Sequence, residues 1–247
     1  MAATGTVGID IGGTGIKGAA VDLSTGELAT ERVKVATPRP ATPDAVAAAV
    51  VGVLGTVGVG GPVGITLPAV VQRGVVRTAA NIDASFLEAD AAALFASSTG
   101  RAVHVLNDAD AAGMAEMRYG AGKGEPGVVV MVTLGTGIGC AVFHDGVLLP
   151  NTELGHLPLH HGDAEAWAAE SARERDDLSW SKWAARLSEY FELLERLLWP
   201  GLFIIGGGIS RKSDKFVPLL TCRTRVVAAT MHNDAGIVGA AMAAPAT

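Results

Sequence analysis

A glycine-rich tetrapeptide occurs twice in this chain, and it constrains the fold more than any other feature. Gly13–Ile16 and Gly135–Ile138 both read GTGI and lie 122 residues apart. An apolar, β-branched run precedes each copy, a second apolar run follows it, and an alanine, Ala19 or Ala141, occupies the matching position in that second run. Such runs joined by a tight turn predict antiparallel strands. We therefore expect two lobes built on a related plan, each offering a glycine hairpin to a shared cleft.

The bulk composition fits a folded chain of this kind. It has 247 residues, of which 49% are hydrophobic and 18% charged, so a sizeable core can form. The net charge of −6 creates no global basic field, so we expect no nucleic-acid partner, and any polyanion must meet a local cationic patch. Two cysteines and an N-terminus without a basic leader or long apolar segment predict a cytoplasmic protein. The longest uncharged run, 127–144, is rich in glycine and predicts two strands rather than a membrane span.

Strand and helix patterns alternate along the chain, which predicts an α/β fold with a duplicated mixed β-sheet core and a central cleft. We expect the first lobe at 1–106 and the second at 107–234, with a C-terminal helix at about 235–247 packing back on the first. The expected strands cover 7–10, 16–21, 27–35, 63–67, 103–106 and 202–205. The expected helices cover 42–54, 86–97, 109–119, 163–175, 180–198 and 235–244.

The glycine turns have the composition of phosphate-binding loops. Glycines let backbone N–H groups approach phosphate oxygens, a threonine adds a hydroxyl donor, and Lys17 can neutralise phosphate charge. Asp10, at the end of the first strand, can hold a hydrated Mg²⁺. An ordinary hairpin turn is the alternative for each, and neither is a P-loop or a dinucleotide fingerprint, because a strand follows. The candidate phosphate-binding residues are Asp10, Gly12, Gly13, Thr14, Gly15, Lys17, Gly135, Thr136, Gly137, Gly207 and Gly208.

Two further stretches carry candidate chemistry. Asp108 follows a buried strand and precedes a helix, so it is either a helix N-cap or a general base for a hydroxyl nucleophile; beside two phosphate loops we favour the base. Glu153 and His156 can bind neighbouring sugar hydroxyls. A metal site formed by His156, His160 and His161 is the alternative, but the glycines and proline around them disfavour the helix that such histidine motifs use. For His160 and His161 we expect simple exposure to solvent.

In this order, the segments DIGGTGIKG, ND, TLGTGIG, ELGH and IIGGGIS resemble sugar kinases of the ROK (repressor, open reading frame, kinase) family, within the actin–hexokinase–Hsp70 fold group. The resemblance covers nearly the whole chain. TLPAVVQRGVVRTAANID, PNTELGHL and AGIVGAA resemble the actinobacterial branch that phosphorylates glucose from inorganic polyphosphate. The resemblance implies a two-lobed, ribonuclease H-like fold, Mg²⁺ as cofactor, and glucose and polyphosphate, or ATP, as partners. It also implies a homodimer without a membrane partner.

The same resemblance assigns roles to single residues. It makes Asp108 the base on the glucose 6-hydroxyl, and it makes Asn107, Glu153 and His156 ligands of the other hydroxyls. GDAEAWA resembles the segment with a second sugar-binding glutamate, here Glu165, and Asn81 resembles a further sugar-side position. Many family members carry a cysteine-rich zinc motif before that glutamate. This chain has LPLHHGDA there, without cysteine, so we expect no structural zinc.

The remaining alternatives concern the donor and the class of protein. An ATP-dependent glucokinase, or a kinase that uses polyphosphate and ATP on glucose and mannose, would have the same scaffold. A sugar-responsive regulator of this family would carry a DNA-binding domain before Asp10, and we do not expect one in so few residues. A non-catalytic sugar-binding protein would not need Asp108 together with both glycine loops, so their presence disfavours this alternative. The cationic side chains that could guide polyphosphate, or else form a solvated surface, are Lys17, Lys123, Arg211, Lys212 and Lys215.

Overall fold

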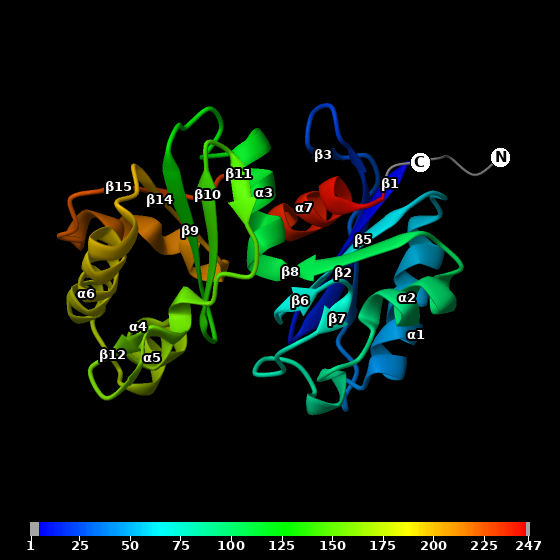
Figure 1. Cartoon of the computed structure of the whole chain (residues 1–247), viewed down its shortest axis with the longest axis horizontal. Coiled ribbons are helices and arrows are strands. Elements are labelled where there is room, and N and C mark those ends of the chain that lie inside the picture. Colours follow the sequence, from blue (N-terminus) through cyan, green and yellow to red (C-terminus); the bar gives the residue numbers. More distant parts are fainter. Residues whose placement is uncertain (1–4, 246–247) are drawn as a thin grey trace. The chain divides into compact units, whose positions relative to one another are not determined.

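The computed structural model describes residues 5–245, which form two compact α/β units (Figure 1). Unit 1 contains the chain up to Ala115 and again from Asp234, and unit 2 contains Glu116–Asn233. The sequence pattern placed the division at residue 107, whereas the units divide inside the helix α3 (Asp108–Tyr119). The C-terminal helix α7 (Ala235–Ala243) belongs to unit 1.

Unit 1 is built on a six-stranded mixed sheet of order β3-β2-β1-β5-β8, with β4 also paired to β2. The β1–β2 and β2–β3 pairs are antiparallel, whereas β1–β5 and β5–β8 are parallel. A separate two-stranded ribbon, β6–β7, follows β5. The strands are β1 (Thr6–Ile11), β2 (Gly15–Asp22), β3 (Glu27–Leu28), β4 (Val33–Ala36), β5 (Val63–Leu67), β6 (Val71–Gln72), β7 (Val75–Val76) and β8 (Val103–Asn107).

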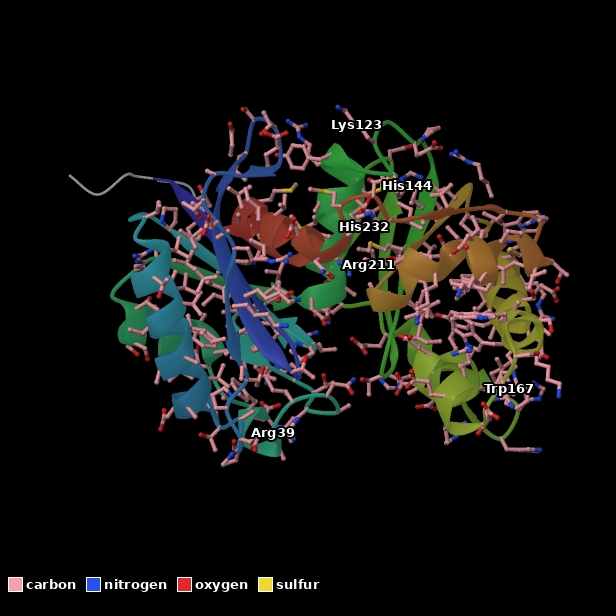
Figure 2. All side chains as sticks on the ribbon, turned by 180° about the vertical axis from the view of Figure 1, so that it is seen from behind. Arg39, Lys123, His144, Trp167, Arg211 and His232 are labelled. Atoms are coloured by element: carbon pink, nitrogen blue, oxygen red, sulfur yellow. The ribbon has the colours of Figure 1, made fainter. Side chains whose placement is uncertain are left out.

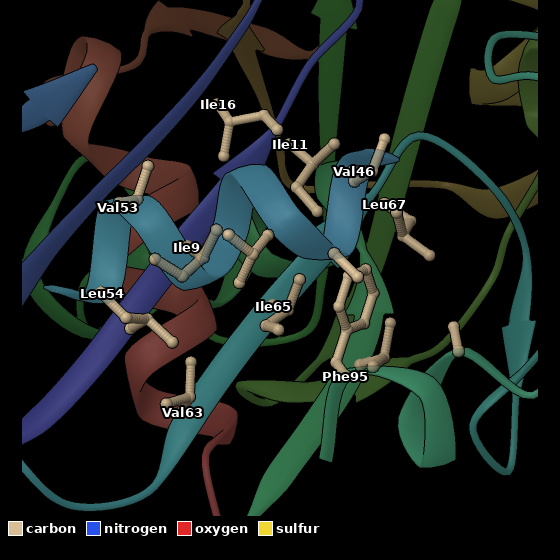
Figure 3. Close-up of a cluster of buried hydrophobic side chains, with 14 of the residues drawn as sticks. Ile9, Ile11, Ile16, Val46, Val53, Leu54, Val63, Ile65, Leu67 and Phe95 are labelled. Atoms are coloured by element: carbon tan, nitrogen blue, oxygen red, sulfur yellow. The ribbon is translucent and has the colours of Figure 1, made fainter. Parts of the chain in front are cut away.

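Apolar helices pack against this sheet. The helix α1 (Pro43–Val57) begins at the N-cap Thr42, whose side chain accepts the Ala45 N–H, and ends at the left-handed Gly58. Together with α2 (Ala91–Thr99) it buries a cluster of aliphatic side chains from β1 and β5, including Ile9 and Ile65 (Figure 3). The helix α7 also contacts β1 and β5. Both α1 and α7 can pack on these strands because alternate residues of a strand point to opposite faces of the sheet.

Close backbone approach explains how α7 packs on those strands. Gly8 and Gly64 are paired neighbours in the β1–β5 register. A Cβ at Gly64 would lie 1.7 Å from the carbonyl oxygen of Ala240, and one at Gly8 would lie 1.8 Å from that of Ile237. Only glycine allows the helix backbone to lie this close to the sheet.

Unit 2 repeats the sheet plan of unit 1. Its five-stranded sheet has the order β11-β10-β9-β14-β15, with antiparallel pairs at β9–β10 and β10–β11 and parallel pairs at β9–β14 and β14–β15. The duplicated sheet confirms the repeat that the two GTGI segments predicted. The strands are β9 (Val128–Leu134), β10 (Ile138–His144), β11 (Val147–Leu149), β14 (Leu202–Gly206) and β15 (Arg225–Ala228), and a small ribbon pairs β12 (Pro158–Leu159) with β13 (Gly162–Asp163).

The long helix α6 (Trp180–Leu198) covers the core of unit 2 with the apolar stripe that the sequence predicted. Trp183, Leu187, Phe191 and Leu194 are fully buried, and Ser179 caps the helix by accepting the Lys182 N–H. The short helices α4 (Ala164–Ala168) and α5 (Glu170–Arg175) precede it, so the expected helix over 163–175 is broken at Ala169. The 3₁₀ segments are Ala84–Phe86, Leu154–His156, Gly208–Lys215, Val217–Leu219 and His232–Asp234.

Two other expected elements also differ in extent. The strand expected at 27–35 is two short strands, β3 and β4, with a break between them. The helix expected at 86–97 begins only at Ala91, because Asp90 caps it by accepting the Ala93 N–H at 2.9 Å. Among residues 5–245, no helix combines the length and apolar character needed to cross a lipid bilayer.

Candidate active-site residues

The first glycine hairpin joins β1 to β2 and carries an ion pair on the sheet itself. Asp10 faces Lys17 in the β1–β2 register and Thr66 in the β1–β5 register. Its Oδ2 lies 3.0 Å from Lys17 Nζ, and its Oδ1 accepts a hydrogen bond from the Thr66 hydroxyl at 3.1 Å. The Gly12 N–H donates to the Gly15 carbonyl, so Gly13 and Thr14 form the tip of the turn. The hairpin therefore presents backbone amides beside a held carboxylate and an ammonium group.

Asp10 fits a hydrated Mg²⁺ better than a fully protein-coordinated metal. Its carboxylate is 16% exposed, and each oxygen already accepts one contact, from Lys17 or Thr66. Mg²⁺ typically keeps several waters and binds one or two carboxylates together with substrate phosphates. One carboxylate with a free lone pair on each oxygen matches that requirement.

A pocket of about 400 Å³ opens beside this hairpin, within unit 1. Gly12, Gly13 and Asn81 line it, so the structure brings this predicted sugar-side residue to the first glycine turn. Its size falls within the range of small-molecule sites. The sequence did not single out Thr37 and Arg39, which also line the pocket; the Thr37 hydroxyl donates to the Gly12 carbonyl at 2.6 Å, and Arg39 (Figure 2) is exposed.

Asn107, rather than Asp108, has the contacts of a helix N-cap for α3. The Asn107 Oδ1 accepts the N–H groups of Ala109 and Asp110 at 2.8 and 3.0 Å, and its Nδ2 donates to the Ala69 carbonyl at 3.1 Å. Asn107 is 8% exposed, so a buried amide fixes the strand–helix junction. Asp108 is half-buried at the first position of α3, and its Oδ1 accepts the Ala109 N–H at 2.8 Å. The capping role considered for Asp108 is thus largely supplied by its neighbour.

The second glycine hairpin joins β9 to β10 and is held by the segment that follows it. The Gly135 N–H donates to the Gly137 carbonyl at 3.1 Å. Ser171 reaches the hairpin twice, since its N–H donates to the Gly135 carbonyl and its hydroxyl to the Thr136 carbonyl at 2.6 Å. Glu165 Oε2 accepts the Ile138 N–H at 3.1 Å. The start of α5 and the carboxylate of α4 therefore fix this turn.

Glu153, His156 and Glu165 lie together in unit 2. His156 Nε2 is 3.5 Å from Glu153 Oε2, and its Nδ1 is 3.9 Å from Glu165 Oε1. The structure adds Asp163, which the sequence had not suggested, with Oδ2 at 2.9 Å from His156 Nδ1. The predicted sugar ligands of this segment are thus neighbours, and a third carboxylate joins them.

The electrostatics of this cluster follow from its crowding. The hydrogen bond to Asp163 raises the pKa of His156, and Glu165 and Glu153 raise it further. The pKa of Glu153 is raised, chiefly because the surrounding protein removes part of its hydration, although its side chain is still 40% exposed. Glu165 also raises the pKa of Glu153, whereas His156 lowers it.

One group in the described part of the chain has the ligand spacing of a metal site. Single ligand atoms of His156, Asp163 and Glu165 lie within 4.8 Å of one another. The two other histidines of this stretch lie outside the group and are exposed, as expected. His160 contacts Glu189 at 2.6 Å and packs on the ring of Trp167, which is labelled in Figure 2. The two shortest of these His156 contacts, to Asp163 Oδ2 at 2.9 Å and Glu153 Oε2 at 3.5 Å, are with carboxylate oxygens.

The third glycine run lies between β14 and the 3₁₀ segment Gly208–Lys215. Gly207 and Gly208 are exposed, and the Ser210 N–H and hydroxyl both donate to the Gly207 carbonyl. Arg211, Lys212 and Lys215 follow on this segment and are exposed. Arg173 of α5 is a cation that the sequence analysis overlooked; its guanidinium lies 3.9 Å from the centre of the Trp180 ring, and Lys215 lies 5.6 Å from the same ring. Lys123 is exposed, in the turn that follows α3.

The duplicated sheets with a glycine hairpin at corresponding positions define the actin–hexokinase class of folds. Within it, the chain belongs to the ROK family, whose family model matches residues 6–170. It is 55% identical over 240 residues to a polyphosphate glucokinase of Mycobacterium tuberculosis, covering 97% of this chain and 91% of the relative.

Two solved structures support the fold. An inorganic polyphosphate/ATP-glucomannokinase from Arthrobacter sp. strain KM matches with a TM-score of 0.93 and 52% identity, covering 97% of both chains. A ROK family glucokinase from Streptomyces griseus, in complex with glucose and AMPPNP, matches with a TM-score of 0.81 and 26% identity, over 97% of this chain and 98% of that one.

Proposed function

We propose that this chain transfers the terminal phosphoryl group of inorganic polyphosphate to the 6-hydroxyl of glucose and so forms glucose 6-phosphate. The observation that carries the proposal is the 55% identity to a polyphosphate glucokinase over 97% of the chain. The glycine hairpins, Asp108 and the Glu153–His156–Glu165 cluster supply residues for each task of such a reaction.

Asp108 is the proposed general base. Phosphoryl transfer needs positioning and charge neutralisation more than covalent catalysis. A carboxylate that accepts the proton of the hydroxyl makes the hydroxyl oxygen a better nucleophile. Asn107 already supplies an N-cap to α3, so the helix does not depend on Asp108 for that role. The carboxylate takes the proton of the 6-hydroxyl as the hydroxyl oxygen attacks the terminal phosphorus atom. The bond from that phosphorus to the bridging oxygen breaks, and the polyphosphate chain leaves one phosphate shorter.

The other sugar hydroxyls are proposed to bind side chains with the matching donors and acceptors. Glu153 and Glu165 accept hydroxyl protons, His156 offers Nε2, and Asn81 contributes an amide from the pocket in unit 1. Asn107 Nδ2 carries two N–H groups, of which one is used by the Ala69 carbonyl, so the other can serve a hydroxyl.

The donor phosphates are proposed to bind the glycine turns, with Thr14, Thr136, Gly207 and Gly208 contributing hydroxyl or amide groups. Lys17 has three N–H donors and uses one for Asp10, so it can contact phosphate without leaving the ion pair. Mg²⁺ on Asp10, held through water, would offset phosphate charge. Arg211, Lys212 and Lys215, with Arg173 beside Trp180, offer unit 2 a cationic surface for a longer chain.

ATP is the second candidate donor, because a similar structure is that of a polyphosphate/ATP-glucomannokinase. Mannose is the second candidate acceptor on the same ground. We further propose a homodimer that works in the cytoplasm, and the free thiols of Cys140 and Cys222 suit a reducing compartment.

A donor comparison tests the proposal. Purified enzyme, glucose and Mg²⁺ are mixed with long-chain polyphosphate or with ATP, and glucose 6-phosphate is quantified. We expect kcat/KM for polyphosphate to exceed that for ATP. A higher value for ATP would make the chain an ATP-dependent glucokinase, and the absence of product with both donors would contradict the kinase assignment.

A further inference from the structure

The ribbon formed by β12 and β13 returns the chain to His156. Pro158 pairs with Asp163, and Leu159 pairs with Gly162, so His160 and His161 form a two-residue turn. His160 has a φ of 57°, in the left-handed region that such turns use. The Ala164 N–H donates to the Leu157 carbonyl at 2.9 Å, which closes the base of the ribbon. Backbone pairing therefore fixes where Asp163 lies relative to His156, two residues before Pro158.

The contact that results is specific to one nitrogen of the imidazole. Asp163 Oδ2 lies 2.9 Å from His156 Nδ1, whereas Nε2 lies on the side of Glu153 at 3.5 Å from Oε2. An ionised carboxylate can only accept, so this hydrogen bond requires the proton on Nδ1. The charged groups that face the ring are Asp163, Glu153 and Glu165.

In the neutral ring, this tautomer leaves a lone pair on Nε2 beside a carboxylate oxygen of Glu153. Two acceptors 3.5 Å apart do not bond each other. Each of the two atoms has a lone pair that can accept a hydroxyl proton, such as those that adjacent hydroxyls of a sugar provide.

We propose that Asp163 is a positioning residue that fixes the ring orientation and tautomer of His156, so that Nε2 and Glu153 face the sugar as a pair of acceptors. This inference rests on the proposed role of His156 in sugar binding. The side chains of His156 and Asp163 are 42% and 52% exposed, and an exposed pair contributes little to stability. The effect of Asp163 should therefore be seen in sugar binding rather than in folding.

The same ribbon contains an internal control. His160, in the turn, contacts Glu189 of α6 at 2.6 Å, and both side chains are about as exposed as those of the His156–Asp163 pair. Glu189→Gln removes a second histidine–carboxylate contact from the ribbon without touching His156. A merely structural role of such contacts would affect both variants alike.

The test combines nitrogen NMR with kinetics. The chain has six histidines, and a His156→Gln spectrum identifies the signals of His156. At a pH above its titration, we expect His156 to carry its proton on Nδ1 in the wild type and mainly on Nε2 in Asp163→Ala. The KM for glucose should rise about ten-fold in Asp163→Ala, as expected for loss of a charge-assisted hydrogen bond, and less in Asp163→Asn, which keeps an acceptor. The KM for polyphosphate should stay at the wild-type value in Asp163→Ala. In Glu189→Gln, the His156 tautomer and the KM for glucose should both stay as in the wild type.

Two results would overturn the inference: an unchanged His156 tautomer in Asp163→Ala, or an equal rise in glucose KM in Glu189→Gln. A different result would locate the error in the proposed function. If the tautomer changes but His156→Gln itself binds glucose normally, Asp163 does position the ring, and the sugar-binding role of His156 is wrong.

Discussion

The two glycine hairpins share a backbone plan but differ in where their charged groups come from. In unit 1 the sheet itself carries them, since Asp10 and Lys17 are paired residues of β1 and β2. In unit 2 the strands β9 and β10 contain no Asp, Glu, Lys or Arg, and the carboxylate that contacts the hairpin is Glu165 of α4. Both units thus have a glycine turn between two antiparallel strands, but in unit 2 the carboxylate beside the turn comes from outside the sheet. The charged groups beside the first hairpin are those proposed for phosphate and metal, whereas the carboxylate that contacts the second hairpin, Glu165, is proposed to bind the sugar.

The register of the two hairpins shows the same divergence. Ile11 pairs with Ile16 across the first turn, whereas Leu134 pairs with Ile138 across the second, which is one residue shorter. A change of one residue alters which side chains face each other across the strands. The Asp10–Lys17 pairing could therefore not be kept in unit 2 by sequence repetition alone.

The largest expected effect concerns Asp108. Asp108→Asn should lower kcat by about 10²- to 10⁴-fold, the usual contribution of a general base, with little change in the KM for glucose. Asp44→Asn is the matched control, because Asp44 is also in the first turn of a unit 1 helix. Steady-state kinetics with polyphosphate would contradict the assignment if the two variants behaved alike.

Glycine substitutions distinguish packing from function in the two units. Gly64→Ala places a Cβ 1.7 Å from the Ala240 carbonyl oxygen and should cost about 3 kcal/mol of unfolding free energy, because the sheet and α7 must separate. Gly135→Ala meets no atom within 4 Å and should leave the Tm nearly unchanged. If Gly135 amides bind phosphate, the same variant raises the KM for polyphosphate. Thermal unfolding in which Gly135→Ala is as unstable as Gly64→Ala would refute this distinction.

Unit 2 contains a fully buried carboxylate that accepts several hydrogen bonds. Glu116 is fully buried, and its oxygens accept the N–H groups of Ala121 and Met231 and the Thr230 hydroxyl. Glu116→Gln turns one acceptor into a donor and should cost about 2–3 kcal/mol, since a buried N–H then faces other donors. Glu27→Gln, at an exposed site in β3, is the control. Urea unfolding with equal midpoints for the two variants would show that this carboxylate is dispensable.

The smallest expected effect is a gain in stability at the proposed sugar site. Because the pKa of Glu153 is raised in the folded chain, ionising it costs folding free energy above that pKa. Glu153→Gln should therefore raise the Tm slightly at pH 8, and the difference should vanish as the pH falls below the ordinary value of 4.5, where the carboxyl is protonated in both states. The same variant should bind glucose poorly. A lower Tm at pH 8 would mean that the carboxylate stabilises the fold.

Much of the fold could be predicted from the sequence where local patterns are strong. The apolar stripe of α6, with Pro200-Gly201 after it, predicted a helix at the observed bounds. The repeated GTGI predicted two related sheets. The start of α2 was missed because Asp90, a side chain that can cap or simply lie on the surface, decided where the helix begins. The ribbons β6–β7 and β12–β13 were missed because two-residue strands have no readable period.

The candidate site was predictable only as far as motifs reach. Glu153 and His156 are three residues apart, and a single turn of 3₁₀ helix brings them together. Asp163 was missed because it reaches His156 through the pairing of Pro158 with Asp163, and nothing in LPLHHGDA marks a hairpin strongly. The Asn107 cap was missed for a related reason, since Asn107 and Asp108 are both good capping residues and only the geometry separates them.

A pair of substitutions tests directly whether the charged group at the first hairpin binds phosphate and the one at the second hairpin binds the sugar. Lys17→Gln and Glu165→Gln are compared for the KM of polyphosphate and the KM of glucose in one assay. We predict that Lys17→Gln raises the KM of polyphosphate and leaves that of glucose unchanged, while Glu165→Gln does the reverse. The same pair of KM changes in both variants would contradict the assignment of Lys17 to phosphate and of Glu165 to the sugar.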